Sequence, residues 1–274
     1  MHTDAEIREH LERAGLAALA DRVLAGTRPE VWIAAAPVES QALGRSRIGG
    51  APDLPRGMAW PRQRWPRAEA EAWPPIARQE LAEAITAGTV VFEGDQIAFA
   101  LPFVAQLDLE ELAPLQTVLP RRGHLWFFAE QTTALGEIAG YPYCASVCMF
   151  ADDADLVRLE PPRVPEAFDP VTLGFTAGRS LPHANDLGLD GDAWYLYQQT
   201  IAGLEQPPPR HACLPHPDSI SPYPPDGYTA LLRVDTDSTC GTHWGDAAWI
   251  TFAIPDDALA AHRFDEVRGF RWIG

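Results

Sequence analysis

The sequence predicts an α+β protein in which a mostly antiparallel β-sheet carries peripheral helices. From residue 90 onward, short segments rich in branched and aromatic residues alternate with turn-forming residues, which is the pattern of β-strands. Helical patterns are fewer, and they lie near the start of the chain and between the strand segments. A chain of 274 residues fits one large β-rich domain, so we expect a single compact unit over residues 1–274.

The first 26 residues predict a helical segment. Thr3 and Glu6 have the spacing of a capping box, in which each side chain bonds the other's backbone amide. The apolar residues that follow, from Ile7 to Val23, fall near helical spacing. Gly26 is a typical helix end.

The next part of the chain mixes regular and irregular segments. A buried strand is expected at residues 31–36, and a helix at residues 76–87. The prolines and glycines of residues 49–57 predict a stretch without regular structure. Trp60 and Trp65 favour an ordered loop there, because indole rings are seldom left in water.

Strand segments continue in two β-rich halves, residues 31–160 and 161–274, and a helix is expected within residues 186–203. Each half contains an apolar strand that ends in Asp, a turn-rich connection with a glycine, and an aromatic strand. These pairs are FVAQLDLEEL with GHLWFFAE, and ALLRVDTD with GDAAWITFAI. Two explanations are open: an internal duplication of related halves, or a chance likeness between β-rich segments.

Charge limits the classes of partner. The chain has 21 Lys and Arg against 38 Asp and Glu, a net charge of −17. This field repels phosphate backbones and disfavours anionic membranes, so we expect no nucleic-acid or membrane partner. A basic protein partner is compatible with it, and so is an acidic surface that only maintains solubility.

The sequence also predicts a cytoplasmic location. It contains no apolar run of membrane-spanning length, and its N-terminus lacks the basic start and apolar stretch of a signal peptide. Four cysteines are too few for a disulfide framework in a chain of this length. We therefore expect reduced thiols.

Several short stretches together resemble a known family. They are SRIGGAPDLPRGMAWP, FVAQLDLEEL, LPRRGHLWFFAE, HACLPHPD, LLRVDTD and WGDAAWITFAIP. In this order and spacing, across residues 46–130 and 211–267, they resemble the YwqG-like family. The resemblance implies a mostly antiparallel β fold with helices at its edges, and it implies no reaction. Arg233, Pro215 and Ser221 depart from the family pattern, which usually has Gln, Gly and Gln there.

The loop at residues 235–246 is a candidate metal site. Asp235, Asp237 and Asp246 supply three carboxylates, and hard cations such as calcium prefer oxygen ligands. Their spacing matches part of an EF-hand loop, but Cys240 stands where the required Gly would be. The alternative is a polar hairpin connection, because Asp, Ser and Thr favour turns.

The cysteines offer a second metal hypothesis. Cys144 and Cys148 are four residues apart, and His211 and Cys213 would complete a zinc set if they lay nearby. The alternative is that these cysteines are buried and behave as small hydrophobic residues.

A basic stretch within residues 45–67 is a candidate contact surface. It contains six arginines, interleaved with tryptophans, and Trp60, Arg62 and Arg64 are its proposed binding residues. Trp and Arg are the residues most enriched in interface anchors. The alternative is that these arginines pair with the protein's own surplus carboxylates.

Five further polar or aromatic residues are binding candidates. Gln106 and Asp108 alternate on one predicted strand and would line a pocket together, although Asp108 also has the position of a helix N-cap. His211, His243 and Trp244 lie in the segments that carry the resemblance. Structural roles, in hydrogen bonding for the histidines and in the core for Trp244, are the alternative.

The sequence assigns no catalytic residue. It contains no nucleophile elbow, P-loop, dinucleotide-binding turn or HExxH motif. The main functional hypothesis is therefore a protein-binding module with a basic partner. The alternative is a hydrolase, or a protein that binds a divalent cation or a small ligand through residues 235–246.

Overall fold

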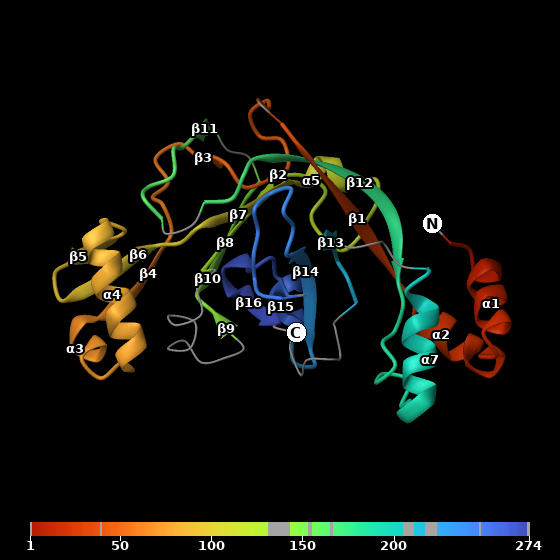
Figure 1. Cartoon of the computed structure of the whole chain (residues 1–274). Coiled ribbons are helices and arrows are strands. Elements are labelled where there is room, and N and C mark those ends of the chain that lie inside the picture. Colours follow the sequence, from red (N-terminus) through yellow and green to blue (C-terminus); the bar gives the residue numbers. More distant parts are fainter. Residues whose placement is uncertain are drawn as a thin grey trace.

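The computed structural model describes residues 2–38, 40–130, 143–152, 155–164, 167–204, 211–216, 224–246 and 248–272. Within these residues the framework is an eleven-stranded sheet (Figure 1). Its strand order is β10-β8-β7-β2-β12-β1-β13-β14-β15-β16-β9, and neighbouring strands run antiparallel. The mixed α+β class with a mostly antiparallel sheet is confirmed.

The strands of the large sheet differ widely in length. They are β1 (Arg28–Pro37), β2 (Arg47–Ile48), β7 (Phe103–Asp108), β8 (His124–Ala129), β9 (Tyr143–Cys144), β10 (Ser146–Ala151), β12 (Val171–Ser180), β13 (His211–Cys213), β14 (Tyr228–Asp235), β15 (Trp249–Pro255) and β16 (Arg268–Trp272). The two longest, β1 and β12, pair with each other along their whole length at the centre of the sheet.

One short run of chain joins the two ends of this sheet. Residues 143–151 contain β9, which pairs with β16, and β10, which pairs with β8. The sheet is therefore nearly closed, and its inner face forms the main hydrophobic core. Phe127 on β8 and Phe252 on β15 meet in that core with ring centroids 4.9 Å apart. Closure removes most of the unpaired strand edges.

Alternation along the strands divides the side chains between two layers. On β8, Leu125 and Phe127 point into the closed sheet, whereas Trp126 and Phe128 point outward. The outward pair is covered by β3 (Asp53–Pro55), which pairs with β11 (Leu156–Arg158), and by the loop around it. The prediction of no regular structure over residues 49–57 is therefore wrong at β3.

Two smaller units flank the closed sheet (Figure 1). A side lobe contains β4 (Arg62–Pro66), α3 (Arg67–Ala70), α4 (Pro75–Ala87), β5 (Val90–Glu93) and β6 (Gln96–Ala100). A helical cluster contains α1 (Asp4–Arg13), a short 3-10 turn at Ala17–Leu19, α2 (Ala20–Gly26) and α7 (Gly191–Ile201). Each unit has its own small apolar core.

The helix predictions hold within a few residues. The capping box of Thr3 and Glu6 is present at the start of α1, and the helices expected at residues 76–87 and within 186–203 are α4 and α7. Short helices α5 (Leu109–Leu112) and α8 (Asp256–Ala260) follow β7 and β15. The strand predicted at residues 31–36 is longer, and it is only half-buried because its side chains alternate. No helix in the described part of the chain is long and apolar enough to cross a membrane.

On each side of the central pair β1–β12, the next four strands follow one another in chain order. Next to β12 come β2, β7, β8 and β10, and next to β1 come β13, β14, β15 and β16. A bulge interrupts the pairing between Phe103 and Ala105 on β7, and another lies between Ala230 and Leu232 on β14. The hairpins β7–β8 and β14–β15 therefore share their register as well as their order.

The first prediction concerns the central strand pair. A Cβ atom added to Gly178 on β12 would lie 2.3 Å from Nε1 of Trp32, whose ring crosses that glycine. We expect Gly178→Ala to lower the free energy of unfolding by about 1–3 kcal/mol, because the indole has to move. Urea unfolding followed by tryptophan fluorescence measures this.

Gly174→Ala is the matched control on the same strand, since its Cβ would meet no atom closer than 3.9 Å. We expect a change within about 0.5 kcal/mol for this variant. Equal losses in the two variants would contradict the close packing of Trp32 against β12.

Candidate functional site

A buried carboxylate, Asp53, organises the outer layer of the first half. Arg47 on β2 donates to its Oδ2 at 2.6 Å, and Arg158 on β11 donates to both of its oxygens, at 2.8 and 3.2 Å. Asp53 is inaccessible to solvent, whereas the Arg158 side chain is about one-third exposed. Bidentate arginine–carboxylate pairs combine strength with fixed geometry.

The backbone N–H and carbonyl of Asp53 are also hydrogen-bonded to side chains of the sheet. Its N–H donates to Gln106 Oε1 at 2.8 Å, and its carbonyl accepts from Trp126 Nε1 at 2.8 Å. Burial lowers the pKa of Arg47, although the nearby carboxylate of Asp53 opposes this. These bonds fasten β3 and its loop onto the sheet, and they give the network a structural role.

Gln106 and Asp108 do not share a pocket. Gln106 is fully buried in the Asp53 network. Asp108 accepts from the Glu110 N–H at 3.0 Å and caps α5, as the N-cap interpretation expected. Burial raises the pKa of the Asp108 carboxyl.

The arginines of the basic stretch have partners within the chain. The ion pairs are Arg45 with Glu111 (2.7 Å), Arg56 with Asp155 (2.7 Å), and Arg62 and Arg64 with Glu93 (3.8 and 2.7 Å), while the Arg67 guanidinium lies 5.1 Å from the Phe92 ring. Trp60 donates to the carbonyl of Leu101 and packs edge-on against Phe128. The arrangement fits the interpretation in which these residues satisfy the protein's own groups.

A second buried network surrounds His211 on β13. Its Nδ1 accepts a hydrogen bond from the Asp235 N–H at 3.1 Å. Its Nε2 lies 3.0 Å from Oδ2 of Asp237 and donates to it, because Nδ1 is occupied as an acceptor. Oδ1 of Asp237 accepts from the Thr239 N–H at 2.8 Å. Burial alone would raise the pKa of Asp237, but the hydrogen bonds from His211 and Thr239 outweigh it and hold that pKa below its usual value.

This network contains three potential metal ligands. His211, Asp237 and Cys240 place one donor atom each within 4.8 Å of the others. The tautomer of His211 opposes a metal there: with Nδ1 facing a backbone N–H, the proton sits on Nε2, the atom that would bind the ion. Burial also raises the pKa of the Cys240 thiol, which disfavours the thiolate that a metal needs.

The three carboxylates predicted as a cation site are not gathered. Asp235 pairs with Arg233 at 2.7 Å, Asp237 with His211, and Asp246 is exposed. No group of three ligands that the described residues place within 4.8 Å contains Asp235 or Asp246.

The other two candidates of that loop lie apart as well. His243 is exposed, and Trp244 is buried with its ring 5.7 Å from Phe168. Trp244 therefore belongs to the main core.

The four cysteines are free and lie in the core of the closed sheet. Burial raises the pKa of Cys144 to about 12, and it also raises those of Cys148 and Cys213. The proposed zinc set of Cys144, Cys148, His211 and Cys213 is not among the ligand groups of the described chain. These thiols have the character of small core residues.

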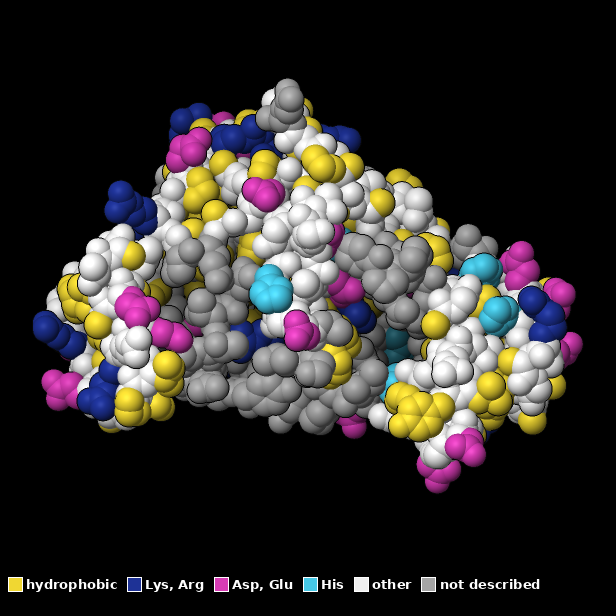
Figure 2. Space-filling model, viewed as in Figure 1, with side chains coloured by type: hydrophobic (Ala, Val, Ile, Leu, Met, Phe, Trp, Pro, Cys, Tyr) yellow, Lys and Arg dark blue, Asp and Glu magenta, His cyan; other side chains and the backbone are white. Residues whose placement is uncertain are grey.

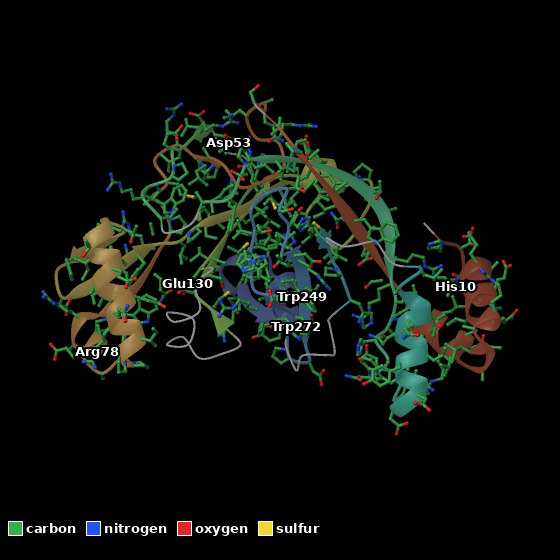
Figure 3. The ribbon with its side chains drawn as sticks, in the orientation of Figure 1. His10, Asp53, Arg78, Glu130, Trp249 and Trp272 are labelled. Carbon is green, nitrogen blue, oxygen red and sulfur yellow. The ribbon has the colours of Figure 1, made fainter. Side chains whose placement is uncertain are left out.

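An aromatic stack on the outer face of the second half escaped the sequence analysis. The Arg233 guanidinium lies 3.9 Å from the Trp249 ring, and Trp249 stacks on Trp272 at 4.2 Å with ring planes 16° apart. The two indoles are labelled in Figure 3, where they lie side by side at the centre of the molecule. Strand register brings Trp249 and Trp272 together, and only a correct pairing of β15 with β16 would have predicted this contact.

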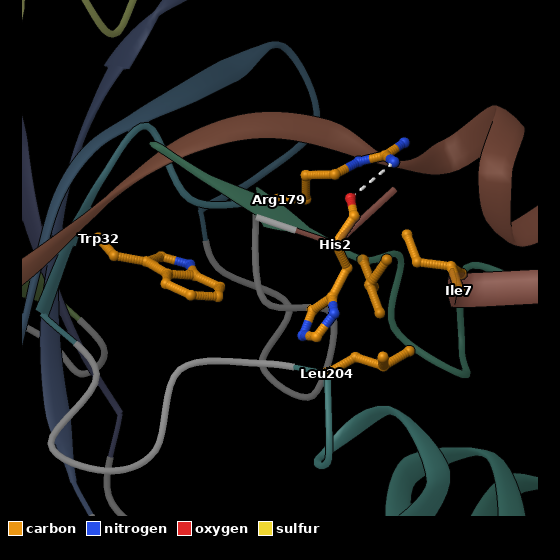
Figure 4. Close-up of a pocket in the computed structure, with 6 residues that line it drawn as sticks. His2, Ile7, Trp32, Arg179 and Leu204 are labelled. Carbon is orange, nitrogen blue, oxygen red and sulfur yellow. Dashed lines mark hydrogen bonds between the residues drawn. The ribbon is translucent and has the colours of Figure 1, made fainter. Parts of the chain in front are cut away.

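Two hollows lie near the helical cluster. The one in Figure 4, between Trp32, Arg179 and the N-terminal residues His2 and Ile7, is too narrow for a ligand. The other, of about 500 Å³, is lined by residues of α2 and of the segment after β12. None of the binding or metal candidates named from the sequence lines either hollow.

The fold and its buried networks define a class of protein: an α+β protein built on one nearly closed antiparallel sheet, with polar groups that fasten loops to it. The family model described as "Domain of unknown function (DUF1963)" matches residues 46–158 and 189–272. The chain belongs to this family, which is compatible with the YwqG-like resemblance. No curated protein matches the chain significantly.

A second prediction tests the Asp53 network. We expect Asp53→Asn to lower the free energy of unfolding by about 3–5 kcal/mol, because it leaves Arg47 buried without its counter-charge. Urea unfolding at neutral pH measures the loss. Asp155→Asn removes the exposed partner of Arg56 and is the control, with a nearly unchanged midpoint. A small loss for Asp53→Asn would mean that the pair contributes little.

A third prediction concerns pH. Because the folded pKa of Asp237 is lowered, its ionised form stabilises the fold above the ordinary aspartate pKa of about 3.9, and this contribution disappears as the pH falls through the folded value. We expect Asp237→Asn to cost about 1.5–3 kcal/mol at pH 7. The difference from the wild type should shrink below about pH 4. A difference that stays constant down to pH 3 would contradict the assignment.

Proposed function

We propose that this protein is a binding module that engages a protein partner through its side lobe. The observation that carries the proposal is the contrast between two parts of the molecule. The carboxylates of Asp53 and Asp237 at the centres of the two buried networks are bonded within the chain, while the side lobe exposes large apolar side chains. Exposed apolar patches on a protein surface commonly mark sites of interaction with other proteins.

The side lobe has more apolar surface than its small core explains. Ile76 and Ile85 on α4 are 53% and 41% exposed, and Phe92 on β5 is 47% exposed. Figure 2 shows hydrophobic side chains at the surface of this lobe, which projects from the closed sheet at the left of the view. Three large apolar side chains exposed on one small lobe support a role in contact with a partner.

The helical cluster offers a second exposed apolar site. Tyr195 and Leu196 on α7 point into solvent, and Figure 2 shows hydrophobic surface at the lower right of the molecule. The two units flank the closed sheet on opposite sides (Figure 1). With a net charge of −17, the partner that fits best is a basic protein.

We also propose that the fold arose by internal duplication. Strands β1, β2, β7, β8 and β10 of the first half would correspond, in chain order, to β12, β13, β14, β15 and β16 of the second. The matching bulges support this, because a chance likeness of two hairpins does not reproduce an irregularity at the same step. Each half would place its first strand against the other half, which makes the halves inseparable as folding units.

The hydrolase or metal-binding alternative is less well supported. Its best feature is the group of His211, Asp237 and Cys240, but the hydrogen bonds of His211 leave no basic nitrogen for a substrate or an ion. The cytoplasmic location remains part of the proposal, on the grounds of the free cysteines.

The test compares lobe variants that each gain one negative charge. We expect Ile76→Glu and Ile85→Glu each to weaken partner binding by about tenfold or more, because a buried carboxylate would replace an apolar anchor. Quantitative affinity capture from native lysate, followed by cross-linking to locate the contact, measures this. The matched control is Ala82→Glu, an exposed position on the same helix that adds the same charge.

Circular dichroism and thermal unfolding of each variant check that the lobe still folds. A stoichiometric partner whose binding is equal in all three variants would contradict the lobe assignment. Recovery of no partner under any condition would contradict the binding function itself.

A further inference from the structure

A cleft of about 500 Å³ lies between the helical cluster and the end of β12. Its lining residues come from α2, the start of β1, and the segments that follow β12 and β13. We call it the α2 cleft. Ligand pockets for small molecules span about 300–1,000 Å³, so this space fits a small organic molecule.

The charges in the α2 cleft are mostly positive. Arg22 comes from α2, Arg28 from the start of β1, and His216 from the segment after β13. Asp186 is the one acidic side chain in the lining, and its Oδ2 already accepts from the His183 N–H at 3.0 Å. In a chain of net charge −17, a cleft with two arginines and one carboxylate stands out.

Arg28 differs from the arginines of the basic stretch. Those arginines pair with carboxylates or pack on a ring, as Arg64 pairs with Glu93. The exposed side chain of Arg28 has no hydrogen bond or ion pair with any described residue. Its five N–H donors are therefore available to a ligand.

Other lining residues of the cleft are held in place by contacts within the chain. Arg22 donates through Nη2 to the carbonyl of Leu187, which fixes its guanidinium at the rim. Gly26 packs directly on Pro182, since a Cβ there would lie 3.0 Å from the proline ring. Ala25, Pro182 and Leu187 supply an apolar floor. A preorganised wall lowers the entropic cost of binding.

From this arrangement we infer that the α2 cleft binds a small organic anion, whose phosphate or carboxylate group contacts Arg28 and Arg22. Arginine matches the planar, two-oxygen geometry of such groups, and the apolar floor accommodates a carbon skeleton. Asp186 and His216, which lie 3.9 Å apart, also line the cleft and supply polar groups for a hydroxyl or amino substituent.

The cleft is independent of the proposed partner surface. It lies next to α2, whereas the exposed apolar side chains of the side lobe lie on α4 and β5. A failure of one proposal therefore leaves the other unaffected.

Isothermal titration calorimetry of the whole chain at low ionic strength tests the inference. The probes are pyrophosphate for the phosphate class and citrate for the carboxylate class, with glycerol as an uncharged control. We expect at least one anion to bind, and the one that binds identifies the class. Arg28→Gln should weaken binding by about tenfold or more, the usual effect of losing a charge-assisted pair.

Two further variants make the result decisive. Arg22→Gln should weaken binding similarly, and because Arg22 also bonds Leu187, its thermal unfolding is measured beside it. Arg13→Gln, on the exposed face of α1, removes the same charge outside the cleft and should leave binding unchanged. The inference is overturned if neither anion binds with a dissociation constant below about 1 mM, or if Arg28→Gln and Arg13→Gln weaken binding equally.

Discussion

The closure of the large sheet is the constraint on which the rest of the molecule depends. Residues 143–151 pair with β16 through β9 and with β8 through β10, so one short segment satisfies both ends of the sheet. Closure encloses an apolar core and excludes solvent from the four buried thiols. Because a buried thiol keeps its proton, the closure that stabilises the sheet also lowers the reactivity of its cysteines.

Two buried side chains, Ser46 and His211, meet the same need at matching places in the two hairpins. Each apolar strand of the matched hairpins ends in an aspartate whose backbone N–H needs an acceptor. In the first half Ser46 Oγ accepts from the Asp108 N–H at 2.8 Å, and in the second His211 Nδ1 accepts from the Asp235 N–H at 3.1 Å. A buried amide without a partner would cost a large share of a protein's net stability. This need accounts for a hydrogen-bond acceptor at Ser46 and at His211.

Local patterns in the sequence were enough to predict the helices, the hairpin strands and the N-cap at Asp108, because each depends on residues close in the chain. The pairing of β1 with β12 could not be predicted, since it joins segments about 140 residues apart and nothing local encodes it. Asp53 was missed for the same reason: Arg158 lies far away in sequence. The sequence held one signal of its role: Asp53 is the single carboxylate among the arginines and prolines of residues 44–66.

The same comparison of halves explains the departure at Arg233. Its counterpart Gln106 is neutral and fully buried, and it bonds Asp53 and Trp126. An arginine at that position brings a charge that a buried site has to neutralise. Asp235 accepts its Nε–H at 2.7 Å, and the face of Trp249 covers its guanidinium at 3.9 Å.

Trp249 is itself held by its stacking on Trp272. The substitution of Arg for Gln therefore comes with a carboxylate and an aromatic face that make it tolerable. The two matched hairpins therefore differ in their outer faces. In the first half that face is sealed beneath β3, and in the second it carries a cation and stacked indoles.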